Sequence, residues 1–143
     1  MSRVWNETKG TVVAEQAWVA DRFWSRCRGL LGHRSLPEGE GLLLRPSFSV
    51  HTAFMRFTID VVFLDRDNRV VKVVPEMKPF RVAIALGAHA ILELPARGAA
   101  RAQIERGDQL AIHPDSGRQA AVLTAEEGRR KIVAGPPRWG RDV

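Results

Sequence analysis

The chain has 143 residues, a formal net charge of +6, and 45% hydrophobic and 27% charged residues, a composition typical of one ordinary globular domain. No apolar run approaches the roughly 18 residues that span a bilayer, and the N-terminus has no signal-like apolar stretch, so we expect a cytoplasmic protein unless a leader was removed. The single cysteine, Cys27, excludes an intramolecular disulfide and a four-cysteine metal site.

The first part of the chain predicts short strands around one helix. A strand is expected at 11–14, and an amphipathic helix at 21–31 places Cys27 on its apolar face. Hydrophobic residues at 42–44 predict a buried strand. β-Branched and aromatic residues predict two further strands, at 50–57 and 59–64.

A β-hairpin is predicted next. Residues 65–69 form its turn, in which Asn68 can adopt a positive φ, and residues 70–74 return as the partner strand. Simple alternation places the odd-numbered residues of this strand on one face and the even-numbered residues on the other.

The remaining elements complete one domain. We expect strands at 90–94, 108–113 and 119–123, an alanine-rich helix at 98–105, a second short helix at 124–133, and a poorly packed tail at 134–143. The expected fold is therefore a single α+β domain over residues 1–133. Its core would be a mainly antiparallel sheet or a partly closed barrel with one or two short helices.

The run from Val50 to Asp65 combines the character of a buried strand with polar and ionisable side chains, which cost free energy in a core unless they are paired. One interpretation is a polar network that fixes the core, with Arg56 bridging Asp60 across a bend. The other is a small cleft. The cleft would be lined by His51, Thr52, Met55 and Arg56.

Two carboxylates elsewhere join these candidates. Glu93 lies between leucines on a predicted strand and needs a partner, for which Arg56 and His51 are the natural choices. A pairing of His51 with Glu93 would suit acid–base catalysis as well as a core salt bridge. Asp108 most simply binds backbone amides in a tight turn. The candidate binding residues are His51, Thr52, Met55, Arg56, Asp60, Glu93 and Asp108, with His51 and Glu93 as the catalytic candidates.

Several short motifs stand out along the chain. They are Arg28-Gly29-Leu30-Leu31-Gly32, Gly39-Glu40-Gly41-Leu42-Leu43-Leu44, His51-Thr52, Met55-Arg56-Phe57, the run from Ile59 to Asp65, Ala90 to Pro95, and Arg106-Gly107-Asp108. Together they resemble the small prokaryotic family known as domain of unknown function 192. Thr58 stands where proline is usual, and Asn68 where the turn usually has glycine. The resemblance implies a compact, mainly antiparallel β fold with one or two helices. It implies no activity, and many relatives carry an export signal or a membrane anchor.

Three functions remain open from the sequence. The leading hypothesis is a small binding or accessory module whose polar cleft holds a small anionic or polar ligand or a peptide, with Arg56 recognising an anion. A hydrolase using His51 and Glu93 is the alternative. A nucleic-acid binder is ranked last, because the arginines are scattered and no basic–aromatic interleaving occurs. No metal-ligand spacing is present, so we expect neither a metal nor a cofactor, and the oligomeric state stays open.

Overall fold

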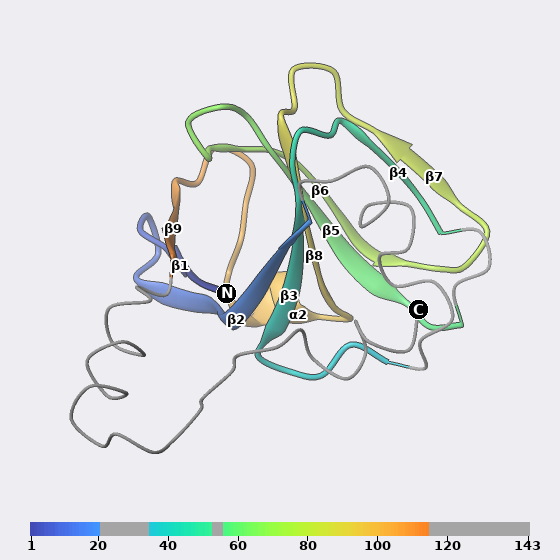
Figure 1. Ribbon diagram of the computed structural model, residues 1–143, viewed down its shortest axis with the longest axis horizontal. Helices are drawn as coiled ribbons and strands as arrows, with labels where there is room; N and C mark the ends of the chain where they lie inside the picture. Colours follow the sequence, from blue (N-terminus) through green and yellow to red (C-terminus); the bar gives the residue numbers. More distant parts are fainter. Residues whose placement is uncertain (21–34, 53–55, 115–143) are drawn as a thin grey trace, which may run out of the picture.

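The computed structural model describes residues 1–20, 35–52 and 56–114 (Figure 1). Strands dominate these ranges, and they are joined by short turns. The elements are β1 (Ser2–Asn6), β2 (Thr11–Ala20), β3 (Glu40–Leu44), β4 (Ser49–His51), β5 (Ile59–Leu64), β6 (Val70–Met77), β7 (Val82–Ile84), β8 (Ala90–Pro95), α2 (Gly98–Arg101) and β9 (Leu110–Pro114).

The main sheet has seven strands in the order β6-β5-β8-β3-β2-β1-β9. Its strand pairs are antiparallel except for β2 and β3, which run parallel. The sheet curls so far that its two edges approach each other at one end. There, Arg69 beside β6 forms a β-bridge with Gln109 beside β9. The Leu110 amide also donates to the Asn68 carbonyl at 3.0 Å. The result is a curled, mainly antiparallel half-barrel, which confirms the predicted α+β class.

The two faces of this sheet bury different apolar cores. Leu92 and Leu94 of β8 point into a first core, which also contains Ala99 of the short helix α2. Ile91 of the same strand points to the opposite face, into a second core. Alternation along a strand therefore places Glu93 on the face of the second core.

A two-stranded sheet, β4 paired with β7, covers the second core. Figure 1 shows these two strands side by side, set apart from the main sheet. Val50 of β4 and Ala83 of β7 point inward and belong to the second core. We call this element, with its adjoining segments 45–52 and 78–89, the β4–β7 ribbon.

Several predicted elements are confirmed with shifted ends. The hairpin of β5 and β6 forms as predicted, and Asn68 adopts a φ of 62° in its turn. The predicted strand at 11–14 continues to residue 20, whereas the predicted helix at 98–105 ends at Arg101. The predicted elements at 21–31 and beyond residue 114 lie outside the described residues.

The prediction of the strands was wrong in four respects. Strands β1 and β7 were not predicted, and the strand predicted at 50–57 ends at His51. Strict alternation in β6 also failed, because the register shifts beside Val70. As a result Val70 and Val73 face the first core, while Val71 and Val74 face the second. A β-bulge adds one unpaired residue, and this reverses the faces beyond it.

Replacing Leu92 with alanine should lower the free energy of unfolding by about 2–5 kcal/mol, because the substitution leaves a cavity in a packed core. Leu92 is fully buried in the first core. The matched control is Leu86→Ala, at a leucine that is 88% exposed, and it should change stability by less than about 0.5 kcal/mol. Chemical denaturation of both variants measures the difference. Equal losses would contradict the assignment of the core.

Candidate functional site

The structure divides the predicted site residues into two groups. His51 and Arg56 are exposed at the surface. Thr52, Asp60, Glu93 and Asp108 are buried. Met55 lies outside the described residues. The predicted residues are therefore not gathered into one cleft, and each buried one has its own surroundings.

Thr52 fastens the end of β4 to the segment that leads into β7. Its amide donates to the Arg81 carbonyl at 2.8 Å, and its hydroxyl donates to the Lys78 carbonyl at 2.7 Å. The same hydroxyl accepts from the Arg81 amide at 2.8 Å. With its hydroxyl and amide both engaged, Thr52 holds the β4–β7 ribbon together.

Asp60 binds backbone amides rather than a cation. Its Oδ1 accepts from the amides of Glu76 at 2.8 Å and Arg97 at 3.1 Å, and its Oδ2 accepts from the Ala99 amide at 2.9 Å. The predicted bridge from Arg56 to Asp60 was wrong, because three amides saturate the buried carboxylate while the arginine remains exposed. Hydrogen bonds to a buried charge stabilise as effectively as an ion pair would.

The substitution Asp60→Asn should lower the free energy of unfolding by about 3 kcal/mol, since hydrogen bonds to a charged group contribute about 1.5–3 kcal/mol each. In the variant, the carboxamide nitrogen is itself a hydrogen-bond donor and would face a backbone amide that also donates. The control is Asp67→Asn on the exposed turn between β5 and β6. Denaturant unfolding measures both variants. Equal stability of the Asp60 variant and the wild type would show that the amides find other acceptors.

Asp108 anchors a polar network that joins the β1–β2 turn to the loop before β9. Its carboxylate accepts from Asn6 Nδ2 at 3.0 Å, the Glu105 amide at 3.0 Å and Lys9 Nζ at 2.9 Å. Burial disfavours ionisation, but the hydrogen bonds from Lys9 and Asn6 outweigh it and hold the pKa of Asp108 below its usual value. The same hydrogen bond to the Asp108 carboxylate raises the pKa of Lys9 above its usual value. Asp108 is thus a structural anchor.

Glu93 is a buried carboxyl group that has no charged partner. Its side chain is on the second core's face, between Leu42 and Val61 of the neighbouring strands. Burial raises its pKa from 4.5 to about 8, so the group is protonated at neutral pH. Among the described residues, two buried side-chain atoms lack a hydrogen-bond partner, Glu93 Oε2 and Trp18 Nε1. Trp18 pairs with Leu42 across β2 and β3, so both atoms belong to one row of that face.

The variant Glu93→Gln should remove a pH dependence of stability. Between pH 4.5 and about 8 the folded protein keeps a proton that the unfolded chain has lost. The free energy of unfolding of the wild type should therefore fall as the pH rises through this range, by at most about 5 kcal/mol in total. Above this range it should level off. The measurement is the difference in unfolding free energy between variant and wild type as a function of pH. Exposed Glu7→Gln is the control, and parallel profiles for Glu93→Gln would show that Glu93 ionises freely.

The proposed catalytic pair is not assembled. His51 is exposed at the end of β4, and no hydrogen bond or ion pair joins it to Glu93. Within residues 1–20, 35–52 and 56–114, no three histidine, cysteine, aspartate or glutamate side chains cluster in a way that could hold a metal ion. The geometry thus provides neither a histidine activated by Glu93 nor a metal-activated water in this part of the chain.

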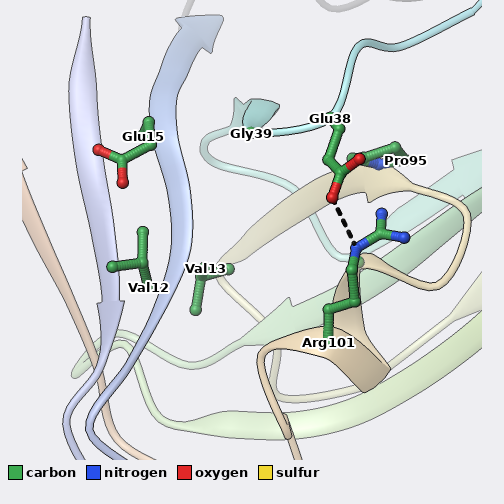
Figure 2. A pocket seen from close by; sticks show the side chains of 8 residues that line it. Val12, Val13, Glu15, Glu38, Gly39, Pro95 and Arg101 are labelled. Atoms are coloured by element: carbon green, nitrogen blue, oxygen red, sulfur yellow. Dashed lines mark ion pairs between the residues drawn. The ribbon is translucent and has the colours of Figure 1, made fainter.

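One cavity, of about 150 Å³, lies between β2, the turn before β3 and the helix α2 (Figure 2). Its charged groups are already paired. Arg101 Nε is 3.5 Å from Glu38 Oε1 across the cavity, and Glu15 pairs with Arg3 at 3.0 Å. Because a ligand would have to displace these pairs, the cavity is a weak candidate for an anion or cation site.

A larger depression, of about 360 Å³, lies at the base of the β4–β7 ribbon. Its polar side chains are Ser47, Ser49 and His89, and Phe48 supplies an apolar wall. The sequence interpretation did not assign these residues to the cleft. The one available signal was that two long segments around them, 41–59 and 77–92, contain no aspartate or glutamate.

Fold and cavities together define a small β-rich module, a curled half-barrel with a two-stranded ribbon over its outer face. The chain belongs to the family of domain of unknown function 192, described as an uncharacterized ACR, whose model matches residues 4–112. This confirms the resemblance found in the sequence motifs.

Relatives in the family carry the name UPF0127 protein. One from Thermococcus kodakarensis is 31% identical over 121 residues, which cover 82% of this chain and 77% of the relative. One from Thermococcus sibiricus is 32% identical over 132 residues, covering 89% and 84%. These names assign no activity.

Two crystal structures share the fold. A protein of unknown function from Novosphingobium aromaticivorans has a TM-score of 0.67 and 22% identity, covering 77% of this chain and 82% of its own. A Sinorhizobium meliloti protein assigned provisionally as a transcription regulator has a TM-score of 0.68 and 18% identity, covering 78% and 91%. At this identity they show the fold alone. No helix among the described residues is long and apolar enough to cross a bilayer.

Proposed function

We propose that the protein is a small binding module that holds a small anionic or polar ligand in the depression at the base of the β4–β7 ribbon. The proposal rests on one observation, which combines the lining of the depression with the charge of the segments around it. A cavity lined by two hydroxyls and an imidazole lies between chain segments without a single carboxylate.

The chemistry of the lining supports an anion more than a cation. The Ser49 hydroxyl and the His89 imidazole N–H can donate hydrogen bonds to an anionic oxygen. The Ser47 hydroxyl donates to the Ser49 carbonyl at 3.1 Å, which fixes the loop that carries both serines. The Ser47 amide donates to the His89 carbonyl at 2.9 Å, so both sides of the cavity are tied together. A preformed site loses less entropy when it binds.

His51 and Arg56 keep a supporting role in this proposal. Both are exposed, and His51 shares the outer face of β4 with Ser49. Arg56 would attract an anion to this side of the molecule without touching it in the cavity, because an exposed cation acts mainly through the rate of association. His51 can offer the approaching anion a hydrogen-bond donor.

His89→Ala should weaken the binding of inorganic phosphate by about tenfold, because one hydrogen bond to a charged group contributes roughly 1.5 kcal/mol. Amide chemical shifts followed during a phosphate titration measure the affinity and the location. The shifts should concentrate at residues 46–49 and 88–89.

The matched control is His113→Ala, at an exposed histidine on β9. It should leave phosphate binding unchanged. Small shifts spread over the whole surface, or equal effects of the two variants, would overturn the proposal.

A further inference from the structure

The β7 half of the outer face of the β4–β7 ribbon is apolar where water is expected, and β4 places Ser49 and His51 beside it. Because Val50 and Ala83 point into the second core, their neighbours on each strand point away from it. On β7 these neighbours are Val82 and Ile84, which are 69% and 49% exposed. A strand face of this kind is normally polar when it faces solvent.

The apolar face continues beyond the strands. Leu86, in the turn after β7, is 88% exposed, and Phe48, just before β4, is 53% exposed. Gly87 closes this turn with a φ of 88°. Scattered single apolar residues on a surface need no explanation, whereas a contiguous group on one protruding element marks an interaction site. We call Phe48, Val82, Ile84 and Leu86 the apolar face.

The surroundings of the apolar face carry only positive charge. The longer segments 41–59 and 77–92, which include the ribbon, contain arginines and lysine but no carboxylate. Lys78 and Arg81 are exposed directly before β7. Lys72 of β6 donates to the Ile84 carbonyl at 3.0 Å, which brings a third ammonium or guanidinium group to the rim.

The carboxyl groups that flank these segments along the chain are Glu40, Asp60, Glu76 and Glu93. Asp60 is buried and accepts from three backbone amides, and Glu93 is buried and protonated at neutral pH. Glu76 pairs with Arg97 at 3.3 Å. The cations beside the apolar face therefore remain available to an external anionic partner.

We propose that the β4–β7 ribbon docks on the surface of an anionic lipid bilayer. The apolar face would enter the boundary between headgroups and acyl chains, and Lys78 and Arg81 would bind lipid phosphates. A nucleic acid would satisfy the cations but leave four apolar side chains in water. An apolar protein partner would cover the apolar side chains. It would not account for surroundings that carry cations and lack carboxylates. An anionic bilayer suits both features. The inference shares Phe48 with the lining of the phosphate cavity, but its test variants at Leu86, Lys78 and Arg81 lie outside that lining.

The test is sedimentation of the full chain with vesicles of phosphatidylglycerol mixed with phosphatidylcholine, and with vesicles of phosphatidylcholine alone. The wild type should bind the anionic vesicles and bind the neutral ones far more weakly. Leu86→Ser should reduce binding by about tenfold, since it removes a buried leucine side chain from the boundary region. The double substitution Lys78→Gln and Arg81→Gln should reduce it roughly 25-fold, at about 1 kcal/mol per cation.

Two controls are matched to these variants. Val19→Ser changes an exposed apolar residue on β2, and Arg106→Gln removes an exposed cation near α2. Both should bind like the wild type. Absence of binding to anionic vesicles, or equal losses in test and control variants, would overturn the proposal. So would a loss that follows charge alone, which indicates that the apolar face does not enter the bilayer. A change of oligomeric state in Leu86→Ser would also overturn the proposal, because it indicates contact between copies.

Discussion

The buried carboxylate of Asp60 fixes the corner where β5, β6 and α2 meet. Two of its three amide donors, Glu76 and Arg97, adopt left-handed conformations with φ of 48° and 69°, which side chains other than glycine rarely adopt. A charged acceptor compensates for this strain by satisfying amides that would otherwise be buried without partners. The third donor, Ala99, brings α2 into the first core. One side chain of β5, in the middle of the family's motif, thus links β5 to the end of β6 and to α2.

How much of the fold the sequence predicts depends on the range of the interactions that form each element. The β5–β6 hairpin and the strand β8 were predictable, because alternation and turn residues act within a few positions. Strand β7 was not predictable in this way. It has three residues and is held by Thr52, which lies about thirty positions earlier and binds the segment ending at Arg81. Strand β1 likewise depends on its two partners, β2 and β9, of which β9 is distant in sequence.

For the site, the sequence correctly marked Asp60 and Glu93 as polar groups in apolar surroundings, but it assigned the wrong partners to them. The backbone amide predicted as a partner of Asp108 is found at Glu105. The prediction paired ionised side chains with one another, whereas the fold pairs Asp60 with backbone amides. Lys9, the partner of Asp108, is 99 positions away and has no local signal. Pairings over such separations follow from the topology of the sheet, which residue spacing does not contain.

The use of the carboxylates also explains why one surface differs from the rest. Asp60 and Asp108 accept hydrogen bonds inside the protein, and Glu93 is protonated at neutral pH beneath the ribbon. None of them contributes a negative charge to the outside of the β4–β7 ribbon. The segments around the ribbon contain no carboxylate of their own, so its arginines and lysine act on solvent and partners. The polar residues that stabilise the inside and the cations that define the outer surface are therefore separate sets, and substitutions can address one without disturbing the other.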